Sequence, residues 1–239
     1  MSDFKIGIDY GGTKIEGILI DSNGKEILRK RSTYEKNYES GLNTVKSLVS
    51  EFDKFTDQQN SVGVCIPGFS SYETGLVNNA NCIWINDKPF HKDLEKSLNR
   101  EIRIMNDANC FALSEAIDGS GANYKSVWGV IIGSGFGGSF VYEKKVIEGV
   151  NQIAGDWGHQ PLPYPTEEEI NSNVQCNVGN CKRPLCAEQF ISGIGFTKLF
   201  NEKYGTSLRT REIVALEANG DERAKKEFEL YEDRFARLI

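Results

Sequence analysis

The chain has 239 residues, of which 39% are hydrophobic and 26% charged, a composition that is typical of a folded globular protein and excludes extensive disorder. Its net charge of −6 argues against a nucleic-acid partner, because phosphate binding needs a basic patch. No apolar stretch approaches the roughly 20 residues of a membrane span and the N-terminus lacks the pattern of a signal peptide, so we expect a cytoplasmic protein that does not bind membranes.

The first predicted elements form a glycine-tipped hairpin. Residues 4–10 and 15–21 are strand-like, and residues 24–33 continue as a third strand after the Asn23-Gly24 turn. Apolar residues then recur at three- and four-residue spacing from Leu42 to Phe52, which predicts a helix. The sequence therefore predicts a three-stranded meander followed by a crossover helix.

Strands and helices alternate in the next segment. Residues 62–68, "VGVCIPG", predict a short apolar strand, and residues 102–117 predict a strand that passes through a polar turn directly into a helix. This alternation is typical of an α/β domain with a largely parallel sheet, in which ligand-binding groups collect at the carboxyl ends of the strands.

The polar segment 118–126 is the expected domain boundary, which gives an N-terminal domain of residues 1–118 and a C-terminal domain of residues 119–239. After it, residues 127–149 repeat the opening pattern of apolar strand, glycine-rich tip and second strand. Two such hairpins, each leading its own domain, predict a duplicated architecture with a central cleft. The alternative is two unrelated hairpins.

The glycine-rich tips indicate phosphate binding. Exposed backbone N–H groups in a tight turn form an anion-binding concavity, and glycine supplies positive φ and lets a phosphate approach the main chain. In the first tip, Thr13 can add a hydroxyl donor and Lys14 a cation, while Asp9 is placed to hold Mg²⁺ or its water shell. Neither tip matches a P-loop or a dinucleotide-binding fingerprint. The glycines concerned are Gly11, Gly12, Gly133, Gly135, Gly137 and Gly138.

Asp107, in "IMNDANC", stands at the predicted turn between a strand and a helix. A carboxylate in that position can act as the general base toward a substrate hydroxyl, as in many phosphoryl-transfer sites. Asp is equally common there as a helix N-cap, for structural reasons alone. The spacing leaves both interpretations open.

Five segments in one order resemble the ROK family of sugar kinases, within the actin-like ATPase and hexokinase superfamily. They are "DYGGTK", "NDANC", "IGSGFGG", "AGDWGH" and the cysteine cluster followed by "AEQFISGIGF", and together they span essentially the whole chain. The resemblance implies a ribonuclease H-like α/β fold, duplicated into two domains around a central cleft. "NNANCIWINDKPFHKDL" and "DWGHQPLPYP" are most similar to the fructokinase/mannokinase branch, while "NDANCFALSEA" is equally close to N-acetylglucosamine kinases.

The resemblance also implies an activity, the transfer of phosphate from Mg-ATP to a hexose hydroxyl, with Asp107 taking the hydroxyl proton. Asp156 stands where most members have glutamate, so its bond to the sugar needs a shifted ligand or a bridging water. The implied phosphate-binding residues are Asp9, Gly11, Gly12, Thr13, Lys14, Gly133, Ser134, Gly135, Gly137 and Gly138. The implied sugar-binding residues are Gly68, Asn81, Asn106, Asp107, Asp156, His159 and Glu188.

The six cysteines fall into two groups. Cys176, Cys181 and Cys186 lie close together, and the family resemblance adds His159, which would complete a closed tetrahedral site for a structural Zn²⁺. Family members usually show C-x-C-x4-C, so Cys176 stands three residues early and reaches the site only if the following segment bulges. Plain reduced thiols are the alternative. The others, Cys65, Cys82 and Cys110, are expected to be small buried residues.

The last predicted helix ends the chain, whereas in relatives it runs on into a strand, a glycine-rich loop that binds adenosine and a further helix. We therefore expect uncovered apolar surface on this helix and weak or absent kinase activity. The leading hypothesis is a fructokinase/mannokinase-like enzyme, with N-acetylglucosamine kinase as the alternative and a homodimer as the usual assembly in relatives. A catalytically weak sugar-binding protein and a sugar-responsive repressor are alternatives of another class. The repressor needs a helix-turn-helix, and only residues 1–3 precede the first strand.

Overall fold

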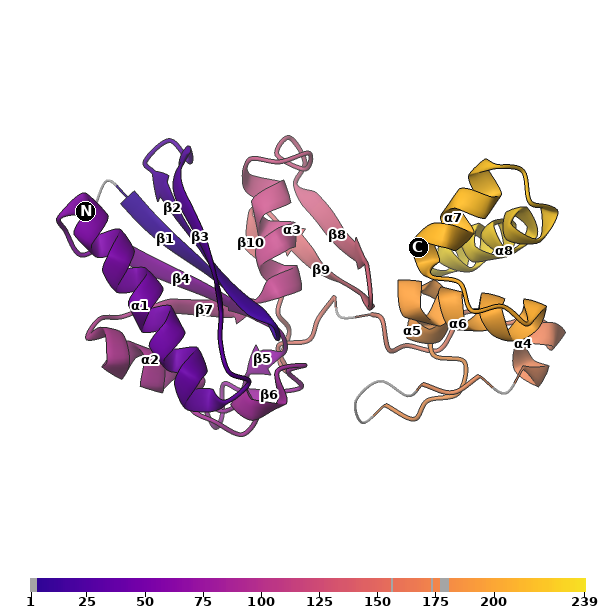
Figure 1. The fold of residues 1–239 in the computed structure, drawn as a ribbon, viewed down its shortest axis with the longest axis horizontal. Coiled ribbons are helices and arrows are strands. Elements are labelled where there is room, and N and C mark those ends of the chain that lie inside the picture. Colours follow the sequence, from indigo (N-terminus) through magenta and orange to yellow (C-terminus); the bar gives the residue numbers. More distant parts are fainter. Residues whose placement is uncertain (1–3, 156, 173, 177–180) are drawn as a thin grey trace. The chain divides into compact units, whose positions relative to one another are not determined.

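The computed structural model describes residues 4–155, 157–172, 174–176 and 181–239 (Figure 1). Two compact units make up the chain. The first comprises Met1–Ser114 and Glu148–Ile153, and the second comprises Glu115–Ile147 and Ala154–Ile239. The division into domains 1–118 and 119–239 stays a prediction. Among the described residues, every helix is too short or too polar to cross a membrane.

The first unit contains a five-stranded sheet in the order β3-β2-β1-β4-β7. Strands β1 (Phe4–Tyr10), β2 (Lys14–Asp21) and β3 (Glu26–Thr33) form the predicted antiparallel meander. Strands β4 (Ser61–Ile66) and β7 (Arg103–Asn106) continue the sheet in parallel with β1. The carboxyl ends of β1, β4 and β7 therefore share one edge, as the α/β pattern predicts.

The helices of the first unit pack against its sheet, and the buried side chains between them form one apolar core. The predicted crossover helix is α1 (Tyr38–Thr56), which packs with α2 (Phe90–Leu98) against the strands. Helix α3 (Asp107–Ile117) follows β7 without a loop. Short elements lie between β4 and α2, namely β5 (Phe69–Ser70), β6 (Val77–Asn78) and the 3₁₀ helix η1 (Ile83–Ile85). A Cβ at Gly41 in α1 would lie 2.0 Å from the Tyr10 hydroxyl, so glycine lets α1 approach β1.

The second unit begins with the predicted second hairpin. Strands β8 (Ser126–Ile132) and β9 (Phe136–Tyr142) pair antiparallel, and β10 (Lys145–Val146) adds to β9. The helices that follow are α4 (Glu167–Asn171), α5 (Ala187–Ile191), α6 (Gly193–Tyr204), α7 (Thr210–Ala218) and α8 (Glu222–Leu238).

Helix α8 packs against the second unit at its buried positions, but Phe228 and Leu230 are partly exposed and Ile239, which follows the helix, is 71% exposed, so the expected uncovered apolar surface is found in part. Leu238 is 6% exposed and lies in the core of the second unit, with Tyr231 and Phe235 packed against it. On the same helix, Arg234 Nε and Arg237 Nη2 each donate to the buried carboxylate of Glu169 at 2.8 Å. These contacts fasten α8 to α4 within the second unit.

Candidate active site

The first predicted phosphate segment is the turn between β1 and β2. Gly11 N donates to Lys14 O at 3.1 Å and closes this turn, while the Tyr34 hydroxyl donates to Gly11 O at 2.8 Å. Thr13 and Lys14 are exposed. Asp9 is also exposed, at the carboxyl end of β1. Tyr34 thus fixes the turn through Gly11, while the side chains of Thr13, Lys14 and the nearby Asp9 are open to solvent.

Two glycines of the tips, Gly11 and Gly138, are required by close packing and not by backbone conformation. None of those described has a φ in the left-handed range, so the prediction that they supply positive φ is wrong. A Cβ on Gly11 would lie 2.9 Å from Lys14 O, and one on Gly138 would lie 2.5 Å from Gly129 O. Gly138 also lies inside β9, as does Gly137, so both belong to a strand and not to the turn itself.

Asn106 and Asp107 form the junction between β7 and α3. Asn106 Oδ1 accepts from the backbone N–H groups of Ala108 at 3.0 Å and Asn109 at 3.2 Å. Its amide nitrogen donates to Gly68 O at 2.9 Å. Asn106 therefore caps the helix, the role that the sequence left open for Asp107. Asp107 Oδ1 accepts a local hydrogen bond from Ala108 N at 2.8 Å.

The electrostatic surroundings of Asp107 favour its protonated form. The residue is exposed, yet desolvation by the surrounding protein raises the pKa of its carboxyl group, and the negative charge of Asp9 raises it further. The backbone N–H of Ala108 opposes this rise. A raised pKa makes the carboxylate a better proton acceptor, which suits a general base.

Three cysteines, Cys65, Cys82 and Cys110, lie in the neighbourhood of Asp9 and Asp107. Cys65 lies opposite Asp9 in the parallel register, and its thiol donates to Asp9 Oδ1 at 3.4 Å. The neighbouring thiol of Cys110 raises the pKa of Cys65, as does burial, and the thiol of Cys65 lowers the pKa of Cys110. Cys82 is fully buried as predicted, whereas Cys65 and Cys110 are only partly buried. Sequence reasoning missed these two residues, although Cys65 lies at the end of β4, close to Gly68, and Cys110 lies three residues after Asp107.

A cavity of about 330 Å³ lies beside Asn106 in the first unit. Gly68, with φ +81°, lies at the same strand edge and fits only as glycine, because a Cβ there would lie 2.4 Å from Asn78 O. Gln152 in the cavity wall has a buried amide oxygen with no hydrogen-bond partner among the described residues. Asn81 is exposed and is not among the lining residues. The lining includes Phe69, Ser70, Tyr72, His91, Met105, Asn106, Asn109 and Gln152.

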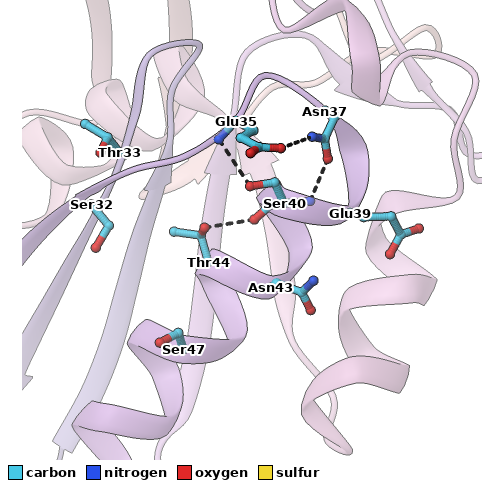
Figure 2. A pocket seen from close by; sticks show the side chains of 9 residues that line it. All are labelled: Ser32, Thr33, Glu35, Asn37, Glu39, Ser40, Asn43, Thr44 and Ser47. Atoms are coloured by element: carbon cyan, nitrogen blue, oxygen red, sulfur yellow. Dashed lines mark hydrogen bonds between the residues drawn. The ribbon is translucent and has the colours of Figure 1, made fainter.

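A second hollow in the first unit, of about 620 Å³, contains none of the predicted site residues (Figure 2). Four of the lining residues, Glu35, Asn37, Ser40 and Thr44, are joined by hydrogen bonds at the start of α1. Asn37 Oδ1 caps the helix by accepting from Ser40 N at 2.8 Å, and the Thr44 hydroxyl donates to Ser40 O at 2.8 Å. This hollow is therefore explained by helix capping.

In the second unit, Glu188 holds the second glycine tip. Its carboxylate is 5% exposed, and Oε2 accepts from Phe136 N, the first residue of β9, at 2.8 Å. A Cβ on Gly135 would lie 3.2 Å from Oε1 of the same carboxylate. Gly133, Ser134 and Gly135 themselves are exposed. The predicted sugar ligand Glu188 is therefore in contact with the predicted phosphate tip.

An apolar cavity of about 380 Å³ adjoins that tip. Gly133 and Ser134 form part of its wall, and Gly193 N donates to Gly133 O at 2.8 Å. The remaining wall comes mainly from helices and includes Ile191, Ile194, Phe196, Val214, Phe228 and Tyr231. A flat apolar group attached to a phosphate chain suits such a cavity.

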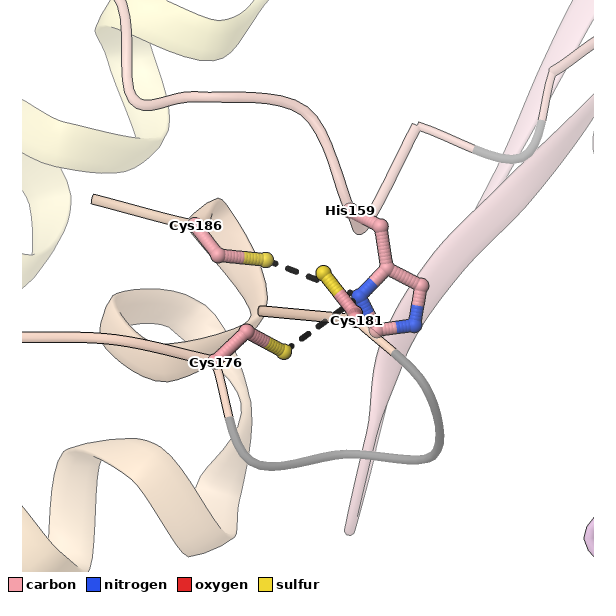
Figure 3. A group of neighbouring side chains, drawn as sticks. All are labelled: His159, Cys176, Cys181 and Cys186. Atoms are coloured by element: carbon pink, nitrogen blue, oxygen red, sulfur yellow. Dashed lines mark hydrogen bonds between the residues drawn. The ribbon is translucent and has the colours of Figure 1, made fainter. Parts of the chain in front are cut away.

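The predicted metal ligands converge in the second unit. One ligand atom from each of His159, Cys176, Cys181 and Cys186 lies within 4.8 Å of the others. His159 Nδ1 faces the thiols, 3.6 Å from Cys176 Sγ and 3.5 Å from Cys186 Sγ (Figure 3). Cys176 therefore reaches the cluster despite its irregular spacing. The segment 177–180, in which a bulge was expected, lies outside the described residues, as does Asp156.

The predicted site residues divide between the two units. Those of the first tip, with Gly68, Asn81, Asn106 and Asp107, belong to the first unit, and those of the second tip, with Glu188 and the His/Cys cluster, belong to the second.

Comparison with known proteins identifies the family. The model of the ROK family matches residues 5–239. The N-acetyl-D-glucosamine kinase of Pasteurella multocida (strain Pm70) is 38% identical over 232 residues, which cover 95% of this chain and 75% of that protein. The chain belongs to the ROK family. The N-acetyl-D-glucosamine kinase of Citrobacter koseri is 39% identical over 231 residues, 96% of this ROK chain and 76% of that protein.

Solved structures support the same fold for this ROK protein. The ROK hexokinase from Thermus thermophilus superposes with a TM-score of 0.80 at 22% identity, covering 94% of this chain and 72% of that one. A ROK family glucokinase from Streptomyces griseus, in complex with glucose and AMPPNP, gives a TM-score of 0.69 at 20% identity, covering 95% and 75%. The predicted actin-like ATPase fold is confirmed.

Replacing Asp107 in this ROK protein tests its electrostatic surroundings. Because its folded-state pKa is raised, the folded protein binds more protons than the unfolded one between the ordinary and the raised pKa, and stability falls as pH rises through that window. Without nucleotide or Mg²⁺, Asp107→Asn should therefore melt at a higher temperature than wild type at pH 7. The difference should vanish below about pH 3.9, the ordinary value for Asp. Asp118 is an exposed residue just after α3, so Asp118→Asn should have the Tm of wild type at both pH values. A lower Tm for Asp107→Asn than for wild type at pH 7 would contradict the raised pKa of Asp107.

Proposed function

We propose that this chain transfers the γ-phosphoryl group of Mg-ATP to a hydroxyl of N-acetylglucosamine, with Asp107 as the general base. One observation carries the proposal. Asn106 takes over the capping of α3, which leaves the exposed Asp107 carboxylate, with its raised pKa, for a chemical role. The relatives at 38% and 39% identity that are named N-acetyl-D-glucosamine kinases support the choice of reaction and sugar.

In this mechanism, Asp107 accepts the proton of the attacking hydroxyl while the oxygen approaches the γ-phosphorus. The exposed groups of the first tip, the Thr13 hydroxyl and the Lys14 ammonium, contact the phosphate oxygens and align them. Asp9 offers a hard oxygen ligand at the strand end, which suits Mg²⁺ or its water shell. When bound there, Mg²⁺ would supply positive charge to offset the charge that develops on the phosphoryl oxygens.

We place the nucleotide on the second unit. Gly133 to Gly135 expose backbone groups for phosphate, and the adjoining apolar cavity of about 380 Å³ would accommodate the base. Glu188 fixes the start of β9, so it keeps the tip in one conformation. Its second predicted role, binding the sugar, and that of His159 remain part of the proposal.

The cavity beside Asn106 supports an acetamido sugar over fructose or mannose. An acetamido group presents one N–H donor and an apolar methyl group. The unpartnered amide oxygen of Gln152 could accept a hydrogen bond from the acetamido N–H. Phe69, Ile104 and Met105 form an apolar part of the cavity wall that suits the methyl group. N-acetylglucosamine, the alternative in the sequence analysis, is therefore better supported than the fructokinase/mannokinase hypothesis. The expected homodimer stays a prediction.

Steady-state release of ADP with a panel of sugars tests this function. Turnover by wild type is expected to be weak, as the sequence analysis predicts, with the highest kcat/KM for N-acetylglucosamine among N-acetylglucosamine, glucose, mannose and fructose. Asp107→Asn should lower kcat by about 10²–10⁴, the usual contribution of a general base, while Asp118→Asn should match wild type. No turnover with any sugar, combined with a rise in Tm on adding N-acetylglucosamine, would instead establish the sugar-binding alternative.

Substitution of Gln152 tests the sugar choice separately. Gln152→Leu removes the orphaned acceptor, so kcat/KM for N-acetylglucosamine should fall about fivefold to tenfold, which corresponds to one neutral hydrogen bond. The value for glucose, which lacks the acetamido group, should stay the same. Gln58→Leu, beyond the C-terminal end of α1, serves as the matched control. Equal losses for both sugars would place the acetamido group elsewhere.

We also propose that His159, Cys176, Cys181 and Cys186 bind one structural Zn²⁺. Three thiolates and an imidazole are a preferred donor set, and their mutual distances fit ligands arranged tetrahedrally around one ion. Cys186 precedes α5 directly, and its thiol contacts Gly158 O, which also accepts from Glu188 N at 2.8 Å. The site would therefore stabilise the segment that carries Glu188.

Metal analysis of protein purified without chelators tests the zinc site. We expect about one zinc per chain, since four ligands close one tetrahedral site. Cys176→Ser should lose most of the zinc and melt at a lower temperature, because metal binding contributes to folding. Cys82→Ser should retain the metal. Full zinc binding by Cys176→Ser would show that the irregular cysteine is not a ligand.

A further inference from the structure

Cys176, the predicted ligand with irregular spacing, is brought to the His/Cys cluster by backbone pairing. Its N–H donates to Arg183 O at 3.1 Å. Next to it, Gln175 and Pro184 form an antiparallel bridge. These contacts fix the main chain of Cys176, whereas the direction of its thiol also depends on the side chains that pack around it. One of these side chains is the amide of Gln189.

Gln189 is a buried polar residue on α5 that has no role in the proposals above. It is 8% exposed, and its Nε2 donates to Cys176 Sγ at 3.9 Å. Its backbone is held on two sides. Gln189 N donates to Cys186 O at 3.0 Å, and a Cβ on Gly195 would lie 2.3 Å from Gln189 O, so glycine lets α6 pack directly against this turn. The amide of Gln189 is therefore held beside the thiol of Cys176.

We propose that Gln189 is a positioning residue that directs the Cys176 thiolate toward the zinc ion. The inference rests on the proposed zinc site and adds to it a residue outside the four ligands. Gln189 acts through Cys176 and does not itself contact the ion. Residues in such a position orient the ligands of metal sites and raise their affinity.

The charge of the proposed site favours an N–H donor at this sulfur. Three thiolates carry three negative charges and Zn²⁺ supplies two positive ones, so a site with a neutral His159 keeps one net negative charge. Cys176 is fully buried, and its share of that charge lies away from water. A hydrogen bond from the Gln189 amide stabilises the thiolate, which is the form that binds metal. The same bond keeps the sulfur in one direction, so less order has to be created when the ion binds.

A second glutamine beside Cys176 offers a matched control. Gln189 and Gln175 line the same cavity of about 240 Å³ in the second unit. Gln175 is exposed, whereas Gln189 is buried against the thiol. Methionine is an unbranched side chain without an N–H donor, so it removes the hydrogen bond and still fills the space. The same change at the two positions therefore compares an amide that contacts the ligand with one that faces solvent.

The zinc affinity of the full chain tests the proposal. Wild type and variants are loaded with zinc and equilibrated with a chelator of known zinc affinity, and the zinc that stays bound is measured by elemental analysis. We expect the Kd for zinc to rise about 10–100-fold in Gln189→Met. Gln189→Glu should bind zinc more weakly still, because a carboxylate beside a thiolate repels it. Gln175→Met should have the Kd of wild type.

A double-mutant cycle separates this role from support of the fold alone. In a Cys176→Ser background the thiolate is absent, so adding Gln189→Met should leave the Kd for zinc unchanged. If Gln189 only supports the fold, the two substitutions weaken zinc binding independently and their effects multiply. Effects that multiply therefore overturn the proposal.

The outcomes also separate the role of Gln189 from the zinc site itself. A wild type that binds no zinc removes the proposed metal site and this inference with it. Zinc binding by wild type with the same Kd in Gln189→Met overturns the role of Gln189 alone. If Gln189→Met is unfolded by circular dichroism, Gln189→Glu, which keeps the shape of glutamine, takes its place in the comparison, and a Kd equal to that of wild type overturns the proposal.

Discussion

The candidate site depends on one side chain, the amide of Asn106 at the junction between β7 and α3. Its oxygen caps the helix and its nitrogen holds the Gly68 carbonyl at the end of the neighbouring strand. Because a helix start needs only one such cap, the next residue is released from that task. Asp107 can therefore keep a carboxylate that its surroundings destabilise, which is a common trade-off at active sites.

In each unit, a side chain from a different part of the chain hydrogen-bonds the backbone at the glycine tip. In the first unit the Tyr34 hydroxyl binds Gly11 O, and in the second the Glu188 carboxylate binds Phe136 N. Glu188 is joined through Gly158 to the His159 and Cys186 cluster. A metal in that cluster would therefore stabilise the second tip through a short chain of hydrogen bonds, far along the sequence from the glycines themselves.

Hydrophobic periodicity and glycine turns were enough to predict the elements that matter most here. The meander, the crossover helix α1, the strand-to-helix junction at residue 107 and the second hairpin all follow from local patterns, which operate over a few residues. The five motifs, which occur in the order found in ROK proteins, allowed the family to be predicted as well. Local patterns and family motifs are both contained in short segments, so they can be recognised without knowledge of the fold.

Features that depend on contacts between distant segments could not be predicted in the same way. Asp107 and Asn106 are both good helix caps by residue type, and only the hydrogen bonds of the folded chain assign the role to Asn106. The neighbourhood of Cys65 and Asp9 comes from parallel pairing of β1 with β4, 56 residues apart. The glycines of the tips looked like positive-φ positions, yet none of them has such a φ, and at Gly11 and Gly138 it is a neighbouring carbonyl oxygen that leaves no room for a side chain.

The division of labour between Asn106 and Asp107 is the central claim, and a paired alanine comparison measures it most directly. Equilibrium unfolding and single-turnover phosphoryl transfer would be measured for both variants at pH 7. The account predicts that Asn106→Ala loses about 0.5–2 kcal/mol of stability, as other helix caps do, and that Asp107→Ala loses phosphoryl transfer without losing stability. Equal destabilisation by the two substitutions, with phosphoryl transfer retained in Asp107→Ala, would contradict it.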